Sequence, residues 1–241
     1  MRNSSNNLDI PTVLVPKASD VLADRLRDLI LDEGLPEGTP LPTERELVAK
    51  SGLSRGSVRE ALRVLETEGL IVTKAGRNGG SAIRRPTRES ISRSFELFLR
   101  SHGVRFDALL EAREAVEPAA ARLAALHRSE EDIAEITEVH RELETLSGNA
   151  AKFAKVNLKW HLAVVKASKN ELLITFVGAI SRPIYAATEY QSFNTAELRR
   201  DVVRVHGRVL DAIIQQDGEA AFRRMQRHMA AYSQVANKLA K

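Results

Sequence analysis

Three histidines in the second half of the chain each interrupt a stripe of apolar residues with helical spacing: His161, His206 and His228. Apolar neighbours three, four and seven residues away indicate that each imidazole faces the core of a helical domain. A buried imidazole needs a polar partner, and one divalent ion satisfies three at once. Asn157 lies one turn before His161 and can add an oxygen ligand. We therefore predict a site for a divalent transition metal of the zinc, nickel or manganese class at these four residues.

The alternative interpretation is that each histidine is a hydrogen-bonded core residue, the usual role of a lone histidine on an apolar stripe. Three such histidines on three predicted helices are unusual, so the metal site is favoured. The same imidazoles with an open coordination position would also suit a metal-dependent hydrolytic enzyme. Against an enzyme, the sequence contains no H-E-x-x-H arrangement that would supply a general base.

An arginine, Arg113, interrupts a further apolar stripe, so its guanidinium faces the interior of the predicted helical domain. An unpaired buried guanidinium is costly. Two partners are open: Glu117, one turn on, and the carboxylate of a bound small molecule, which a guanidinium binds with two parallel hydrogen bonds. Together with a metal, the second option predicts an acidic ligand such as a sugar acid, a hydroxy acid or a dicarboxylate.

Basic residues gather in the first third of the chain. Residues 43–88 contain ten Lys or Arg and five Glu, an excess larger than the net charge of +4 of the whole chain. Such a cluster attracts a polyanion. Arg55, Arg59 and Arg63 follow one another at intervals of four residues and share one face of a predicted helix. The alternative is a solvated face in which these arginines pair with nearby glutamates such as Glu60 and Glu66.

The elements around this cluster outline a winged helix-turn-helix. Thr43-Glu-Arg-Glu46 reads as a capping box that begins one helix, Ser51-Gly52-Leu53 reads as a turn, and a second helix is expected at 54–67. Short β-branched segments at 70–73 and 81–83 predict a hairpin. Because only the first turns of such a recognition helix reach base edges, the predicted DNA contacts on it are Ser54, Arg55, Gly56, Ser57 and Arg59. Arg45, at the start of the preceding helix, is expected to bind a phosphate or a nearby base, and Lys74, Gly76 and Arg77 of the hairpin are expected at the minor groove.

The fold class we expect is mainly α. Residues 1–16 form an arm, 17–85 the winged helix-turn-helix, 86–90 a linker, and 91–239 an antiparallel all-helical bundle of about six to seven helices. Predicted breaks between these helices fall at residues 102–103, 147–148, 168–170, 193–194 and 217–218. With no cysteine, no apolar run of membrane-spanning length and a polar start, the sequence predicts a cytoplasmic protein without a membrane segment.

The motifs of the basic region resemble the N-terminal signature of the GntR family of bacterial repressors and activators. They are Leu41-Pro-Thr-Glu-Arg-Glu-Leu47, Ser54-Arg-Gly-Ser-Val-Arg-Glu-Ala-Leu62, and Glu68-Gly-Leu70. The resemblance implies that the residues matching Arg45, Arg55, Ser57 and Arg59 contact an operator and that Gly76 approaches the minor groove. It also implies a homodimer on palindromic double-stranded DNA, since two-fold protein symmetry matches inverted half-sites.

The second half is similar to the FCD ligand-binding domain of the FadR-like subfamily. The similarity is carried by Glu111-Ala-Arg-Glu-Ala-Val-Glu-Pro118, Asn157-x-x-x-His161, His206 and His228. It implies that the predicted metal site is where the effector binds and that the effector is the predicted acidic small molecule. Metal-binding members of the family usually carry Asp where this sequence has Asn157, and a neutral amide is a poorer ligand, so Asn157 can serve as a weaker ligand or contact the effector instead.

From these observations we predict a transcription regulator, a repressor, whose operator affinity changes when a small organic acid binds to the helical domain. Binding would shift the population between two placements of the winged domains, with either release from the operator or tighter binding to it as the outcome. The alternatives are the hydrolytic enzyme joined to a nucleic-acid-binding domain and a non-specific DNA-binding protein. The compact recognition helix, however, predicts a strong sequence preference.

Overall fold

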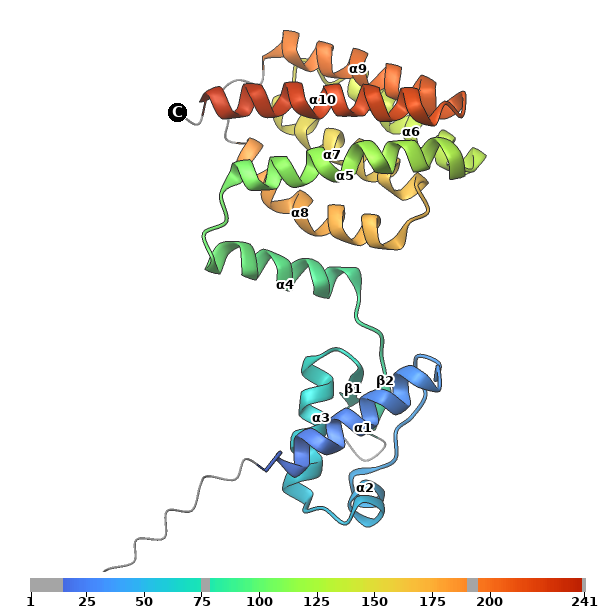
Figure 1. Ribbon diagram of the computed structural model, residues 1–241, viewed down its shortest axis with the longest axis vertical. Helices are drawn as coiled ribbons and strands as arrows, with labels where there is room; N and C mark the ends of the chain where they lie inside the picture. The colour runs from blue at the N-terminus through green and yellow to red at the C-terminus, as the bar shows by residue number, and fades with distance from the viewer. Residues whose placement is uncertain (1–14, 75–78, 190–194, 240–241) are drawn as a thin grey trace, which may run out of the picture. The chain divides into compact units, whose positions relative to one another are not determined.

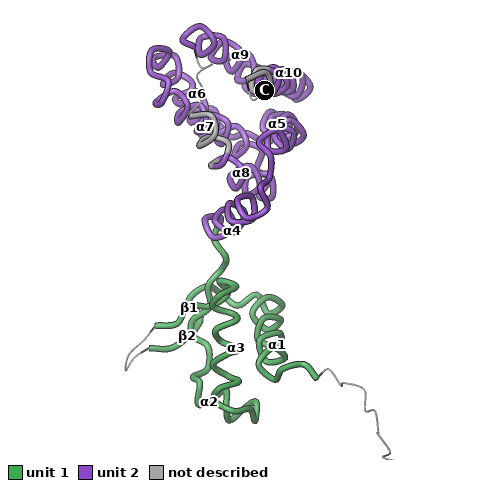
Figure 2. Tube along the Cα trace, turned by 90° about the vertical axis from the view of Figure 1, so that its left-hand side faces the viewer, with its two compact units in different colours: residues 1–87 green, residues 88–241 purple. Residues whose placement is uncertain are grey.

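The computed structural model describes residues 15–74, 79–189 and 195–239. The chain divides into two compact units, residues 1–87 and 88–241, coloured separately in Figure 2. We describe each unit by itself. Among the described residues, no helix is long and apolar enough to cross a membrane.

Unit 1 is a three-helix domain with a two-stranded hairpin, as expected. Its elements are α1 (Ala18–Asp32), α2 (Glu44–Ser51), α3 (Arg55–Thr67), β1 (Ile71–Lys74) and β2 (Gly80–Ile83). The strands are antiparallel, with Ile71 opposite Ile83. The apolar stripe of α3 packs on α1 and on the hairpin, and the largest fully buried side chains of this core include those of Ile30, Leu65, Ile71 and Ile83.

Side-chain caps fix where α2 and α3 begin. Thr43 and Glu46 form the predicted capping box, with the Thr43 N–H donating to Glu46 Oε2 at 2.8 Å. Gly52, in the left-handed region at φ 70°, ends α2. Ser54 Oγ then accepts from the Ser57 N–H at 3.1 Å and caps α3. The recognition helix therefore starts at Arg55.

Unit 2 contains seven helices within its described residues. They are α4 (Arg88–Ser101), α5 (Phe106–His127), α6 (Glu130–Glu144), α7 (Ala150–Ala167), α8 (Glu171–Glu189), α9 (Ala196–Ile214) and α10 (Gly218–Leu239). In Figure 1, α5 lies between α10 and α8, and α4 packs against α8. The main core contains Trp160, Ile136, Leu143, Ile213 and Met225. The prediction of a mainly helical chain with a winged helix-turn-helix and a helical bundle is confirmed.

Two details of unit 2 correct the sequence expectations. Residues 88–90, expected in the linker, already form the first turn of α4. The break between α5 and α6 was not among the five predicted breaks; it falls at Arg128 and Ser129, where Ser129 and Asp132 form a second capping box. The predicted break at 193–194 lies outside the described residues.

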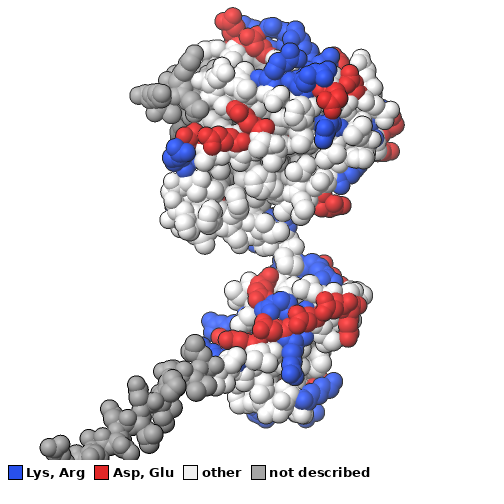
Figure 3. Space-filling model, in the orientation of Figure 1, with Lys and Arg blue, Asp and Glu red and all other residues white. Residues whose placement is uncertain are grey.

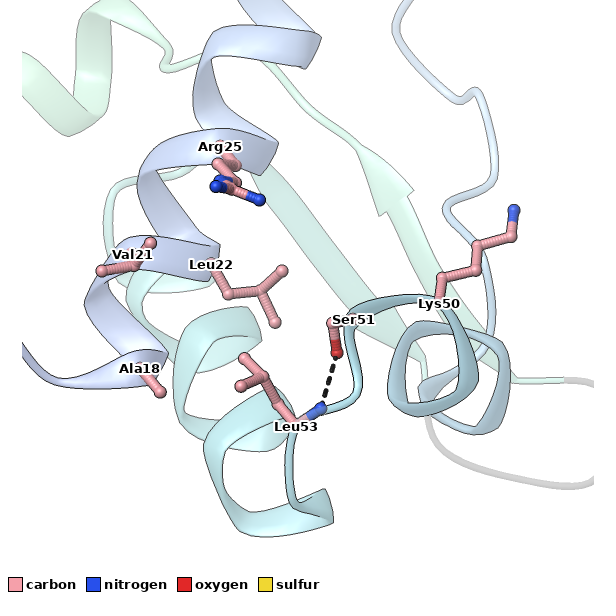
Figure 4. A pocket seen from close by; sticks show the side chains of 7 residues that line it. All are labelled: Ala18, Val21, Leu22, Arg25, Lys50, Ser51 and Leu53. Atoms are coloured by element: carbon pink, nitrogen blue, oxygen red, sulfur yellow. Dashed lines mark hydrogen bonds between the residues drawn. The ribbon is translucent and has the colours of Figure 1, made fainter.

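A cavity of about 340 Å³ lies in unit 1 between α1 and the turn from α2 to α3. Figure 4 shows the side chains of Leu22 and Leu53 in this cavity, with Arg25 and Lys50 farther out. The Leu53 N–H donates to Ser51 Oγ at 3.2 Å and holds the turn. None of the predicted site residues lines the cavity.

Candidate DNA interface and buried histidine site

The predicted DNA-contacting residues of unit 1 lie at the surface. Arg45, Arg55, Gly56 and Arg59 are exposed, as is the capping residue Ser54. Ser57 is half-buried, and its N–H donates to the capping Ser54 Oγ. Exposed arginines at the start of a helix can reach base edges or phosphates, so this arrangement is compatible with insertion into a major groove.

Arg59 makes an ion pair with the preceding helix. Its Nε donates to Glu44 Oε2 at 2.9 Å, and the Arg59 side chain remains 72% exposed. The alternative reading expected such a pair with Glu60 or Glu66; Glu66 instead accepts from the Thr73 N–H at 3.0 Å and ties α3 to β1. Because the Arg59 pair is exposed, it adds little stability, and the guanidinium stays accessible.

The hairpin is described only in part. Lys74, at the end of β1, is exposed, as the predicted minor-groove contact requires. Gly76 and Arg77 lie outside the described residues.

In unit 2 the three predicted metal ligands meet in the core. His161 comes from α7, His206 from α9 and His228 from α10, and all three are buried. One ring nitrogen from each lies within 4.8 Å of the others, and Nε2 of His206 is 3.0 Å from Nε2 of His228. Two imidazole nitrogens bound at about 2.0–2.1 Å to one ion also lie roughly 3 Å apart when adjacent. The donor set therefore fits a divalent ion.

Glu117 holds the first of these histidines in place. The His161 Nδ1 atom lies 2.6 Å from Glu117 Oε2, and the two side chains are almost completely buried. The other oxygen of Glu117 accepts a hydrogen bond from Arg113 Nε, one turn earlier on α5. This contact gives the buried guanidinium the internal partner that the sequence left open. When Nδ1 donates to the carboxylate, Nε2 of His161 is the nitrogen with a free lone pair.

Sequence reasoning paired Glu117 with Arg113 only, so its contact with His161 was missed. The two residues are 44 positions apart and sit on α5 and α7. The one available signal was the position of Glu117 four residues after Arg113, on the same inward face of a helix.

Burial governs the charge state of the site. It raises the pKa of Glu117, but the neighbouring charge of Arg113 and the hydrogen bonds from Arg113 and His161 outweigh burial and hold that pKa well below its usual range. Burial lowers the pKa of His161, partly offset by Glu117. Burial also lowers the pKa of His206 well below its ordinary value, and that of His228 to about 3. All three imidazoles are therefore neutral near pH 7, the form that binds metals.

Three polar atoms near these histidines in the sequence are buried without a hydrogen-bond partner among the described residues. They are Asn157 Oδ1, Trp160 Nε1 and His206 Nδ1. The Trp160 ring stacks on His206 with centroids 3.7 Å apart and planes at 7°. Buried polar atoms without partners are rare in folded proteins and call for a bound ion, water or ligand. The Asn157 oxygen can therefore accept a hydrogen bond or bind an ion, and its role as a metal ligand stays a prediction.

Comparison with known proteins identifies the chain. Residues 18–79 match the model of bacterial regulatory proteins of the gntR family, and residues 108–231 match the FCD domain. The chain belongs to the GntR family, with an FCD domain in its C-terminal half. The enzymatic alternative is therefore wrong, because this is a family of transcription regulators.

Several GntR relatives align over most of the chain. The Glc operon transcriptional activator of Escherichia coli K12 is 30% identical over 219 residues, which cover 87% of this chain and 85% of that protein. The putative L-lactate dehydrogenase operon regulatory protein of the same strain is 29% identical and covers 90% of this chain and 86% of its own length. The HTH-type transcriptional repressor NanR of Salmonella paratyphi A is 28% identical, covering 93% and 86%.

Among solved structures, the GntR protein of Streptococcus agalactiae superposes with a TM-score of 0.68. It shares 22% sequence identity, and the match covers 90% of this chain and 99% of that one. At this identity the likeness shows that the two proteins share a fold.

Proposed function

We propose that this GntR regulator changes its operator affinity when a small organic acid binds at a metal site in unit 2. The observation that carries the proposal is the meeting of three buried, neutral histidines within 4.8 Å of one another. His161, His206 and His228 would hold the ion, with the Asn157 amide oxygen as a further ligand. When bound, the ion supplies a Lewis-acidic position for a carboxylate oxygen.

Two further side chains, Glu117 and Arg113, would shape the site around the acid. Glu117 fixes the ring of His161, which raises the basicity of the ligating nitrogen. Arg113 uses Nε for Glu117, and its remaining N–H groups can donate to an effector carboxylate. One relative is named as the putative regulator of an L-lactate dehydrogenase operon. Because lactate is a hydroxy acid, this name supports a hydroxy acid as the effector. A sugar acid or a dicarboxylate would use the same contacts.

The DNA contacts we propose follow from the exposed start of α3 and the residues next to it in the fold. Bases and phosphates would be contacted by Arg45, Ser54, Arg55, Gly56, Ser57 and Arg59, and the minor groove by Lys74, Gly76 and Arg77. We propose that the protein represses transcription. Of its relatives, NanR is named as a repressor, whereas the regulator of the Glc operon is named as an activator. A reporter gene behind the operator distinguishes the two.

We further propose that the protein binds a palindromic operator as a homodimer. Five of the seven exposed large apolar side chains described in unit 2 lie on α4 and α8: Ile91, Leu97, Phe98, Leu172 and Phe176. Phe95 contacts both Phe98 and Phe176 at 6.2 Å between ring centroids and so links the two helices. This region is mostly uncharged on the face shown in Figure 3. An apolar patch of this kind favours a protein interface, and a second copy is the partner that a palindrome requires.

The test begins with selection of the preferred DNA sequence from a random pool by the purified protein. Fluorescence anisotropy then measures its dissociation constant with Zn²⁺ or Ni²⁺ and a panel of hydroxy acids, sugar acids and dicarboxylates. At least one acid should change operator affinity about 5- to 150-fold, and chelation should remove the effect. An operator dissociation constant that is the same with and without every acid would contradict the proposed effector site. Equal binding to selected and unrelated DNA would instead favour the non-specific alternative.

A further inference from the structure

We infer that the ion and its acidic ligand enter unit 2 as a cooperative pair, because Asn157 leaves the ion without a charged protein ligand. This inference rests on the proposed metal site. Among the histidines and carboxylates of the described residues, those whose ligand atoms lie within reach of one ion are the three histidines, and no carboxylate joins them. With neutral imidazoles and a neutral amide, the protein does not offset the two positive charges of the ion.

The remaining buried charges near the histidines do not supply the missing negative charge. Glu117 is the carboxylate in contact with the site, and it is already shared between Arg113 and His161. The Arg113 charge cancels that of Glu117, since the two form a buried ion pair. Asp132, the other buried carboxylate of the described chain, caps α6 and pairs with Lys169. A divalent ion alone would therefore stand as a buried, uncompensated charge.

A buried charge without a counter-charge is expensive, so the ion alone should bind weakly. A carboxylate from solvent that joins the ion removes most of this cost. The same free energy favours each partner in the presence of the other, because coupling between two bound ligands is reciprocal. An Asp at position 157 would supply the charge from the protein, and the ion would then bind without help. The single amide thus makes the site respond to metal and acid together.

The experiment uses the full-length protein, stripped of metal with a chelator, and Ni²⁺ with acetate as the carboxylate probe. Titration calorimetry measures the Ni²⁺ dissociation constant in acetate and in perchlorate of equal ionic strength, since perchlorate does not coordinate. Emission of Trp160, the one tryptophan of the chain, gives a second readout because its ring stacks on His206. We expect acetate to tighten Ni²⁺ binding about tenfold or more.

The Asn157→Asp variant should bind Ni²⁺ tightly in perchlorate, and acetate should then improve binding less than about threefold. Asn149→Asp is the matched control: it adds the same charge at the exposed N-cap of α7, where Asp is also a good cap, and should behave like the parent. Circular dichroism and thermal unfolding check that each variant is folded.

Equal Ni²⁺ affinity in acetate and perchlorate for the parent would overturn the inference while leaving the metal site intact. An acetate effect in Asn157→Asp as large as in the parent would also overturn it. If Ni²⁺ neither binds nor changes Trp160 emission in any buffer or variant, the metal part of the proposed function fails, and the inference fails with it.

Discussion

The Nδ1 atom of His161 lies 2.6 Å from Oε2 of Glu117, and both side chains are buried in the core of unit 2. A histidine held in this way presents its other nitrogen in a fixed direction and tautomer. The same carboxylate neutralises Arg113. One glutamate therefore satisfies a buried guanidinium and orients a predicted metal ligand, and its removal should affect both stability and metal binding.

Replacing that carboxylate, Glu117→Gln, should lower the free energy of unfolding by about 3–5 kcal/mol, because it leaves the Arg113 charge buried without a counter-charge. Metal affinity should fall about 10- to 100-fold through loss of the His161 contact. Chemical denaturation and calorimetry measure the two effects. The matched control is Glu135→Gln, which removes an exposed ion pair with Lys166 at 2.6 Å and should cost at most about 1 kcal/mol. Similar losses in both variants would contradict the role given to Glu117.

The metal-free protein should lose stability as the pH falls from 7 to 5. Because burial lowers the pKa of His228 to about 3, this imidazole takes up a proton in the unfolded state, below about pH 6.5, before it does so in the folded state. The unfolded state then binds more protons, so stability rises with pH between about 3 and 6.5. His228 alone should contribute roughly 2 kcal/mol between pH 5 and 7.

Glu117 acts in a different pH window. Its pKa is lowered on folding, so its stabilisation is present above about pH 4.3 and is lost only at lower pH. Chemical denaturation of the chelator-treated parent and of His228→Asn at several pH values separates the histidine contribution. The variant should show a fall that is smaller by about 2 kcal/mol; identical pH profiles would show that His228 does not titrate as described.

At the DNA interface, Arg59→Ala should weaken operator binding by about 1–3 kcal/mol and relax the base preference at one position of each half-site. Arg63→Ala is the control on the same helix face, one turn farther from the start of α3, where side chains no longer reach base edges. It should weaken binding slightly and equally for all sequences. Anisotropy measurements on the selected operator and its single-base variants make the comparison. An Arg59→Ala protein with unchanged selectivity would refute the assigned contact.

The proposed dimer interface can be tested by placing charges on the apolar patch. Leu97 and Leu172 are 70% and 81% exposed, and the double variant Leu97→Glu with Leu172→Glu should raise the dimer dissociation constant at least about tenfold, since burying carboxylates is costly. Light scattering after size exclusion measures the mass. Leu126→Glu, at a leucine of α5 that is 55% exposed, is the control and should remain dimeric. A double variant that stays dimeric would place the interface elsewhere.

Local signals in the sequence predicted the elements that position the site. The capping box at Thr43, the glycine at position 52 and the cap at Ser54 each act within four residues, so sequence alone predicts where α2 and α3 begin. Helical spacing likewise placed the three histidines on inward faces. Ser129 and Asp132 form the same kind of capping box at the start of α6, although the five predicted breaks did not include this one.

Contacts between distant segments could not be predicted in this way. Glu117 meets His161 across two helices, and Glu44 meets Arg59 from the preceding helix. A periodic stripe shows which face of a helix is inward but not which residue of another helix lies opposite. For the same reason the partner of Arg113 stayed open, because an inward guanidinium is compatible with an internal carboxylate and with a bound one.

The ion pair between Arg59 and Glu44 has a further consequence for how the protein meets DNA. When Arg59 contacts a base as proposed, it gives up its exposed pair with Glu44, and this costs little because such pairs contribute at most about 1 kcal/mol. The glutamate also repels the phosphate backbone wherever Arg59 finds no suitable base. Partner exchange of this kind penalises wrong sites more than the right one, so Glu44 would sharpen discrimination without touching a base itself.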